Sequence, residues 1–412
     1  MNGKAGPGLL FVLVCAIGAG PVMNYGLSAV SSLIIEDLGI SEAQFGLLAT
    51  ACFASAALSS VSLGRLSDRI SGRAQLLLIF GGSALALVLM ALSHDFVWLL
   101  VAVTLAGPAQ AISNPTTNRV IIHHVDEARR PGWLGIKQSG VQASQLFSSL
   151  FFPAAALLAG WRGAAAGAAV VLGALLLYSW NRMPVEPVRT AAARRTERVR
   201  GFPRPVWMLT AFALFSGAGM QATNVYLPLF AQREVGFSLL LAGAAAAAAG
   251  VVGVASRVFW GQRMARGTQI STLLTLLAVG GIGGSLLLLA AGRTGIPVLL
   301  WAGVLLHGAT VLGMNVVVMA GLMRQVAPSR VGAASGVVSL GMYVGFCLGP
   351  LAMGLLLQFS GSFLAGWIWV CAAYLVCVGL GFGLRGMARP AGSTGPTTAA
   401  PGRRPHSRFT AR

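Results

Sequence analysis

Twelve long apolar segments run through this chain of 412 residues and limit strongly what it can fold into. They lie near residues 9–34, 43–63, 75–92, 97–122, 134–158 and 163–181 in the first half, and near 206–231, 239–260, 270–291, 296–322, 332–357 and 365–385 in the second. A helix of about 20 apolar residues crosses a hydrocarbon core of roughly 30 Å. Because a bilayer supplies no water to backbone groups, each segment must be helical. We therefore predict an all-α membrane protein with twelve transmembrane helices.

Several short patterns recur at an offset near 197 residues. The recurring pairs are Asp37–Ser41 with Glu234–Ser238, Gly64–Arg69 with Gly261–Arg266, Pro153 with Pro350, and Ser139–Val141 with Ser335–Val337, the last one residue out of step. In a strongly apolar chain, two homologous halves are typical of a transporter with a central site. We predict six-helix bundles at residues 1–181 and 206–385, a basic linker at 182–205 and a disordered tail at 386–412.

The composition supports a membrane protein and argues against a nucleic-acid-binding one. Hydrophobic residues make up 56% of the chain and charged residues only 9%, too few for a soluble protein of this length. The net charge of +19 comes from arginines in short blocks between the apolar segments, with no basic face interleaved with aromatics. All five cysteines lie inside apolar segments without metal-ligand or disulfide spacing. We expect no metal, no cofactor and no nucleic-acid partner.

The basic residues gather on one side when the segments are threaded in order. One set of loops holds Lys4, Arg65, Arg69, Arg73, Arg129, Arg130, the linker arginines, Arg263, Arg266, Arg324, Arg330 and the tail, and the opposite set holds Arg162, Arg233 and Arg293. An excess of Lys and Arg marks cytoplasmic loops. We therefore expect an integral protein of a bacterial-type plasma membrane with both termini in the cytoplasm. The apolar run from Leu9 is too long for a signal peptide, so we expect it to be the first span.

The loop after the second segment reads Gly-Arg-Leu-Ser-Asp-Arg-Ile-Ser-Gly-Arg from Gly64 to Arg73. It resembles the signature loop of the major facilitator superfamily, Gly-x-x-x-Asp-Arg-x-Gly-x-Arg, with Ser71 where the family usually has Gly. A weaker counterpart in the second half and Gly160–Arg162 after the fifth segment are also typical of that family. The resemblance covers roughly residues 9–385. It implies two six-helix bundles that rock about a central site formed by spans 1, 4, 5, 7, 8, 10 and 11.

The resemblance also implies a gate at this loop. In the family the acid at Asp68 latches the cytoplasmic ends of the two halves when the cavity opens outward. Its carboxylate can pair with a neighbouring arginine or with the positive N-terminus of a helix, and the repeat places Ala265 where it would recur. The alternative is a basic loop that only sets the topology. The candidate gating residues are Gly64, Asp68, Arg69, Arg73, Arg257 and Gly261.

Polar side chains are unevenly distributed among the segments. The third, sixth, ninth and twelfth contain almost only apolar residues, Gly, Ser and Thr, and we expect them to face lipid. Polar groups within hydrocarbon are costly and turn toward a bundle interior or a wet cavity. The candidates for lining a substrate cavity are Asn24, Tyr25, Asn114, Asn118, Arg119, Lys137, Gln138, Gln142, Gln221, Asn224, Tyr226, His307, Asn315 and Tyr343.

Three ionisable candidates lie within the apolar segments, and each has two interpretations. His307 is ten residues past Pro297, about 15 Å along a helix, and so lies near the midplane. It either binds substrate or a proton, or is held neutral by a neighbouring helix. Arg119 and Lys137 lie near the cytoplasmic ends of the fourth and fifth spans and either extend to the interface or point into the cavity. Pointing inward, they would form a dibasic site for an anion, since Arg binds carboxylates bidentately.

The acidic residues weigh against a proton-coupled exporter of cations. All ten lie in loops or at the ends of segments, so no carboxylate is expected at membrane depth. The fifth segment keeps only Pro153 of the family's antiporter pattern, Gly-x-x-x-Gly-Pro-x-x-Gly-Gly. We favour transport of a small organic solute by alternating access, with uptake of an anionic or polar metabolite ahead of efflux of a drug or metabolite.

Two other classes of protein fit less well. An enzyme needs clustered nucleophiles, carboxylates or metal ligands at membrane depth, and the adjacent His123 and His124 point about 100° apart on a helix. A transporter-like sensor needs a larger output domain than the linker or the tail provides. We expect a monomeric transporter, not an enzyme, with a small-molecule substrate and membrane lipid as partners. Substrate, direction and any coupling proton or ion stay open.

Overall fold

The computed structural model describes residues 6–67, 69–183, 201–327 and 330–387, and every regular element in these ranges is helical. Most of the predicted linker (184–200) and tail (388–412), together with Asp68, lie outside the described residues. The first half comprises α1 (Pro7–Ala19), α2 (Pro21–Ala29), α3 (Ser31–Leu38), α4 (Glu42–Ser67), α5 (Gly72–Leu76), the π-helical turn η1 (Leu77–Gly81), α6 (Gly82–Ala91), α7 (Phe96–His124), the 3₁₀ turn η2 (Glu127–Arg129), α8 (Arg130–Gln138) and α9 (Gly140–Trp180).

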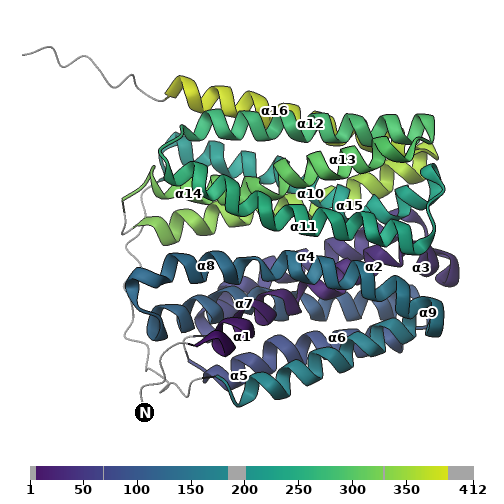
Figure 1. Cartoon of the computed structure of the whole chain (residues 1–412), viewed down its shortest axis with the longest axis horizontal. Coiled ribbons are helices and arrows are strands. Elements are labelled where there is room, and N and C mark those ends of the chain that lie inside the picture. The colour runs from purple at the N-terminus through teal and green to yellow at the C-terminus, as the bar shows by residue number, and fades with distance from the viewer. Residues whose placement is uncertain (1–5, 68, 184–200, 328–329, 388–412) are drawn as a thin grey trace, which may run out of the picture.

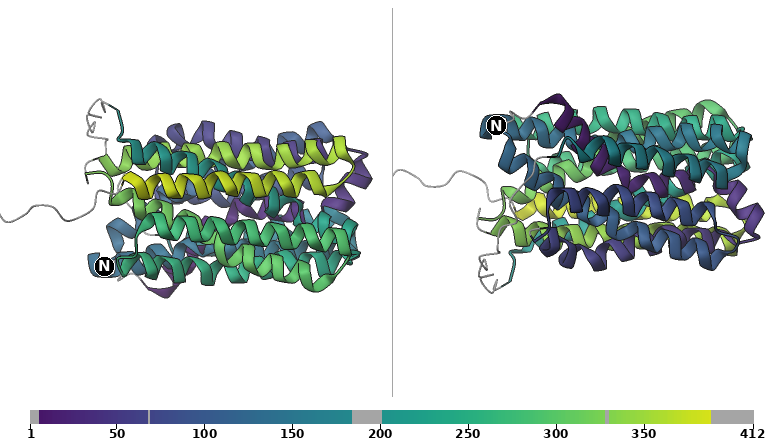
Figure 2. Two further views of the ribbon diagram at one scale, coloured as in Figure 1. Left: turned by 90° about the horizontal axis from the view of Figure 1, so that it is seen from above. Right: turned by 90° about the horizontal axis from the view of Figure 1, so that it is seen from below.

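The second half comprises α10 (Arg204–Val235), α11 (Leu239–Ala265), α12 (Ile270–Thr294), α13 (Pro297–Thr310), the 3₁₀ turn η3 (Val311–Gly313), α14 (Met314–Met323), α15 (Val331–Ser360) and α16 (Phe363–Met387). The helices of each half lie together as one layer, and the two layers run side by side along the long axis (Figure 1). The views from above and below show nearly all helices following that axis (Figure 2).

The helical membrane fold predicted from the sequence is confirmed. Nine segments of the described chain are long and apolar enough to cross a membrane, and the bent pair α1–α2 makes a tenth. One of the nine, residues 132–180, contains two of the predicted spans. The 32-residue helix α10 is also long enough to cross. These segments are consistent with the twelve spans predicted.

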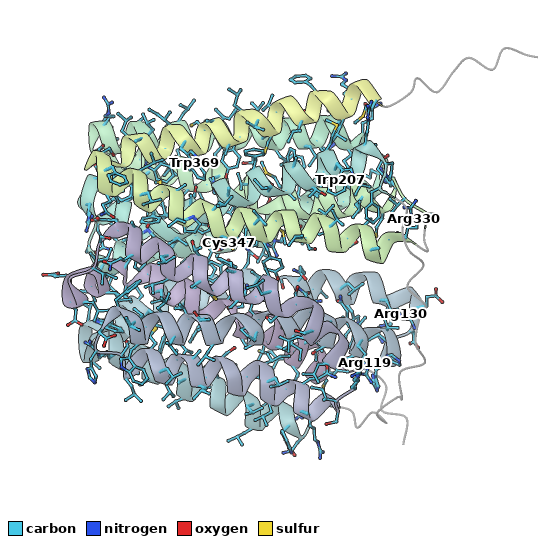
Figure 3. The ribbon with its side chains drawn as sticks, turned by 180° about the vertical axis from the view of Figure 1, so that it is seen from behind. Arg119, Arg130, Trp207, Arg330, Cys347 and Trp369 are labelled. Atoms are coloured by element: carbon cyan, nitrogen blue, oxygen red, sulfur yellow. The ribbon has the colours of Figure 1, made fainter. Side chains whose placement is uncertain are left out.

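The two ends of the bundle differ in the segments found there. At one end, named here the linker end, α9 finishes and α10 begins; at the other, the distal end, α3 turns into α4 at Gly39 and α10 into α11 at Gly236. Both glycines have positive φ, 59° and 73°, a conformation that L side chains rarely adopt. Figure 3 shows Arg119, Arg130 and Arg330 at the linker end and Cys347 between the two halves.

The stretch Gly160–Arg162 connects two predicted spans at the distal end. Gly160 has a φ of +67°, which breaks α9 there. Trp161 Nε1 donates to Asp37 Oδ2 at 3.2 Å, and Arg162 forms an ion pair with the same oxygen at 2.7 Å. Arg162 Nε also donates to the Ser93 carbonyl. These contacts join α9 to the end of α3 and to the turn that follows α6.

Several hydrogen bonds and an ion pair join the two halves at the distal end. Ser28 Oγ donates to the carbonyls of Asn224 and Val225 at 2.8 Å. Nearby, Tyr226 donates to the Glu42 carbonyl at 2.6 Å. The remaining cross-half contacts here are Ser32 Oγ to Gln232 Oε1 at 2.8 Å, Thr50 Oγ1 to the Cys347 carbonyl at 2.6 Å, and the Arg233–Glu42 ion pair at 2.6 Å. The halves are therefore fastened together on the distal side of the molecular centre.

Within the second half, α10 and α15 approach closely through a stripe of glycines. A Cβ added at Gly345 would overlap the Leu214 carbonyl oxygen, and one at Gly349 would overlap the Ala218 carbonyl oxygen. Gly341 meets α10 in the same way at Thr210. Small residues at helix interfaces allow such approach in membranes.

We expect Gly345→Leu to lower the stability of the protein because its side chain must push α15 away from α10. Overpacking of this kind costs about 1–3 kcal/mol or more. The matched control is Gly336→Leu in the same helix, where an added Cβ meets nothing within 4 Å. Thermal unfolding in detergent, followed by size-exclusion chromatography, should show a lower midpoint for the first variant only. Equal midpoints would contradict the packing assignment.

Candidate central binding site

A cavity of about 110 Å³ lies between the two halves. A single water needs roughly 10–15 Å³ measured in this way, so the space suits a small solute with a few waters. Its polar lining consists of Asn24, Tyr25, Gln110, Ser113, Asn114, Gln138, Gln142, Gln221, Asn224, Arg257, Asn315 and Tyr343. Apolar side chains, among them Phe53, Met220 and Phe346, complete the wall.

In the first half, a break in the first span directs side chains into this cavity. The bend between α1 and α2 is 56° and falls at Gly20 and Pro21. Gly20 permits the close approach to α7 because it has no side chain. A Cβ added there would lie 2.6 Å from Cα and Cβ of Gln110. The helix restarts at Pro21, where the missing N–H costs no hydrogen bond. Asn24 and Tyr25 follow as the fourth and fifth residues of α2, and both line the cavity.

In the second half, a break in the tenth span provides an acceptor for Arg257. The turn η3 interrupts the helical hydrogen bonds between α13 and α14, which leaves carbonyl groups available. Arg257 Nε donates to the Leu312 carbonyl at 3.1 Å. Its Nη1 donates across the halves to the Gln138 carbonyl at 3.2 Å, at the point where α8 ends. The guanidinium is thus held in place at the cavity wall.

Arg257 gives the cavity a positive charge. Among the described residues that line it, none is acidic and no other is basic. Arg257 donates hydrogen bonds through Nε and Nη1. Its Nη2 donates none within the described chain. A planar guanidinium can bind an anion through such remaining N–H groups. Eight amide side chains around it offer both donors and acceptors.

Nine of the fourteen cavity candidates from the sequence line this space. They are Asn24, Tyr25, Asn114, Gln138, Gln142, Gln221, Asn224, Asn315 and Tyr343. They come from α2, α7, α8, α9, α10, α14 and α15, which belong to both halves. Their role in binding a substrate stays a prediction.

The basic candidates Arg119 and Lys137 do not line the cavity. Arg119 Nη1 donates to the Ser67 carbonyl, which joins α7 to the last residue of α4. Lys137 is only 2% exposed, so it does not extend to the membrane interface. Its Nζ donates to Asn114 Oδ1 at 3.1 Å and to Asn118 Oδ1 at 2.6 Å. In this structure the two cations therefore do not form the dibasic site envisaged from the sequence.

Two further candidates are buried elsewhere. His307 Nε2 lies 3.0 Å from the Tyr374 hydroxyl, and both side chains are buried between α13 and α16. This contact matches the interpretation of a histidine satisfied by a neighbouring helix. Tyr226 is fully buried and makes the distal contact to Glu42 described above.

The gating candidates lie at different depths in the fold. Gly64 and Gly261 lie within α4 and α11, so the helices continue further toward the linker end than the sequence suggested. Arg69 is exposed, and the Arg73 guanidinium lies 5.6 Å from the ring centroid of Trp180. Arg257, grouped with the loop from the sequence, lines the central cavity instead. Asp68 itself lies outside the described residues.

Arg257 was not among the intramembrane charges expected from the sequence, although its position indicates one. The residue lies inside the apolar segment predicted at 239–260, so it should have been grouped with Arg119, Lys137 and His307. The cavity lining also includes Gln110 of the fourth segment, which was not among the cavity candidates.

Comparisons with known proteins agree on a family. The model of the Major Facilitator Superfamily matches residues 12–292. The probable nitrate/nitrite transporter NarK2 of Mycobacterium tuberculosis, in strains CDC 1551 / Oshkosh and ATCC 25618 / H37Rv, is 27% identical over 345 residues. That similarity covers 80% of this chain and 83% of NarK2.

Solved structures show the same fold at low identity. A bacterial homologue of the human lysosomal transporter Spinster, in an inward-facing and unoccupied conformation, has a TM-score of 0.71 and 18% identity, with 92% of this chain and 94% of that chain covered. A mutant of the nucleoside transporter NupG has a TM-score of 0.73 and 14% identity, with 92% of this chain and 100% of that chain covered. At such identities the likeness concerns the fold alone.

Proposed function

Because this chain belongs to the major facilitator superfamily, we propose that it carries a small anionic or polar metabolite across the membrane by alternating access. The substrate binds in the central cavity between the two halves. The halves then rock, so that the site opens alternately toward the distal end and the linker end. We propose that the linker end faces the cytoplasm, because its loops carry most of the Lys and Arg residues, and that the direction of transport is uptake.

One observation carries the anionic preference: a single guanidinium faces a cavity whose described lining holds no carboxylate. A cation in partly desolvated surroundings attracts an anion far more strongly than in water, because the effective dielectric constant is lower. The same charge repels a cationic solute at short range. The amides surrounding Arg257 supply neutral hydrogen bonds that fix the orientation of the bound molecule.

The name of the mycobacterial relative, a probable nitrate/nitrite transporter, adds support for a small anion. The amide-rich lining also accommodates a small carboxylate with hydroxyl groups, because amides both donate and accept hydrogen bonds. Efflux of a drug or metabolite is the alternative direction. The measured direction of flux in cells with and without the gene distinguishes the two.

The proposed function is tested by ligand binding to purified protein. Nitrate, nitrite, acetate and lactate are compared with choline and glucose in a thermal-shift assay, at constant ionic strength. A ligand that binds only the folded state raises the midpoint of unfolding in proportion to its occupancy. We expect at least one anion to raise the midpoint and choline to leave it unchanged. Stabilisation by choline alone would contradict an anion site.

A further inference from the structure

Lys137 is a buried cation that the central site does not use directly. It lies on the short helix α8 and is 2% exposed. Its ammonium is held by two neutral amide oxygens on α7, those of Asn114 and Asn118. The hydrogen bonds found for it in the described chain include no carboxylate. Among the described residues, the ammonium therefore has neutral amide partners and no acidic one.

The side chain that covers Lys137 is also part of the cavity wall. Asn114 is exposed to the cavity and at the same time accepts from Lys137 Nζ at 3.1 Å. Gln138, which follows Lys137 in the chain, also lines the cavity, and its backbone carbonyl accepts a hydrogen bond from Arg257. Two cations thus contact neighbouring lining residues of the cavity: Arg257 of the second half contacts Gln138, and Lys137 of the first half contacts Asn114. The Asn114 side chain thus contacts both Lys137 and the cavity.

We propose that Lys137 is a second anion-binding group, which the transported anion reaches from Arg257 when the Asn114 side chain moves aside. The inference rests on the proposed function and adds a step to it. The anion leaves the guanidinium of Arg257 and binds the ammonium of Lys137. The ammonium at the same time releases the side-chain oxygens of Asn114 and Asn118. The substrate class is the same as for the central cavity, a small anion of one or two charges.

The chemistry of the pair explains why neutral partners are present. A charge inside a span is costly unless it is compensated, and two amide dipoles compensate it only in part. An arriving anion supplies the missing charge and forms a charge-assisted hydrogen bond. Had an aspartate stood at Asn118, the ammonium would already be neutralised and would gain little from the anion. The asparagines hold Lys137 in position and keep its charge available.

The test uses two substitutions with opposite structural consequences. Lys137→Gln removes the charge. Asn118→Asp keeps the lysine and gives it a permanent partner at the 2.6 Å position, on a residue that does not line the cavity. Uptake of labelled nitrate and labelled lactate into proteoliposomes is measured for both variants, for Lys137→Arg and for the wild type. The midpoint of thermal unfolding is recorded with and without each anion.

We expect both Lys137→Gln and Asn118→Asp to lower the maximal uptake rate roughly 10- to 100-fold, as expected for the loss of one charge-assisted hydrogen bond. Lys137→Arg should keep part of the activity. The thermal shift produced by the anion should persist in both low-activity variants, because Arg257 is intact. A lysine with only a structural role predicts the opposite for Asn118→Asp, namely higher stability with unchanged uptake, and that result overturns the proposal.

The outcomes separate the two proposals. Wild-type uptake of an anion combined with undiminished uptake in Lys137→Gln rejects the role of Lys137 and leaves the proposed function in place. Failure of the wild type to bind or carry either anion rejects the proposed function and this inference with it. Loss of the anion-induced thermal shift in Lys137→Gln would also overturn the two-step order, because the lysine would then belong to the first binding step.

Discussion

Replacement of Arg257 by glutamine should lower kcat/KM for anion uptake by about 100-fold or more, the loss typical of removing one partner from a desolvated charge pair. The guanidinium is the one charged group of the described cavity lining, so the anion loses its counter-charge. The bond to the Gln138 carbonyl is lost as well, and with it a contact between the halves. Arg257→Lys should recover only part of the activity, because an ammonium cannot bind an anion bidentately.

The same helix provides the control for this experiment. Arg263 lies six residues further along α11, is exposed, and stacks 5.2 Å from the ring centroid of Phe259. Arg263→Gln removes the same charge without touching the cavity, so we expect uptake to change less than about threefold, as usual for a surface substitution. Initial rates are measured across a range of substrate concentrations. Equal rates for Arg257→Gln and Arg263→Gln would show that Arg257 does not act on the substrate.

Locking the distal end closed should abolish transport. Ser32 and Gln232 lie on opposite halves with their side chains 2.8 Å apart, and both are half-buried, so reagents can reach them. Cysteines placed at these two positions and joined by a short bis-methanethiosulfonate, which forms a disulfide with each thiol and releases sulfinate, should hold α3 to α10. Because alternating access requires these contacts to open, uptake should fall to background and return when a reductant cleaves the link.

The cross-linking experiment needs a background without the five native cysteines, Cys15, Cys52, Cys347, Cys371 and Cys377. Each single replacement, Ser32→Cys or Gln232→Cys, serves as a control that the reagent alone does not inhibit. Full uptake by a completely cross-linked double variant would mean that the distal end does not open during transport.

Much of the fold could be predicted because the bilayer leaves few alternatives. Apolar segments of sufficient length must be helices, and the 197-residue repeat divides them into two groups. The breaks between α1 and α2 and at η3 could not be predicted in the same way. The α1–α2 break has a local signal, the Gly20–Pro21 pair, but the close approach of Gly20 to Gln110 is a tertiary contact that no local pattern records.

Which polar side chains line the cavity depends on how each helix is rotated about its axis, and the sequence does not fix that rotation. Gln221 and Asn224 are three residues apart, so they share a face of α10 and both reach the cavity. Tyr226 is two residues further on, about 200° around the helix, and points to Glu42 instead. His307 likewise lies on a face of α13 that is turned toward Tyr374 on α16. Polarity alone identified the right helices but not the right faces.

Counterflow in liposomes measures whether this protein moves a small anion through a site at Arg257. Purified protein is reconstituted into vesicles loaded with unlabelled nitrate or lactate, and the entry of the same labelled anion is followed without an ion gradient. We predict transient accumulation of at least one labelled anion by the wild type and none by Arg257→Gln. Accumulation of labelled choline with no accumulation of either anion would show that the site carries cations and not small anions.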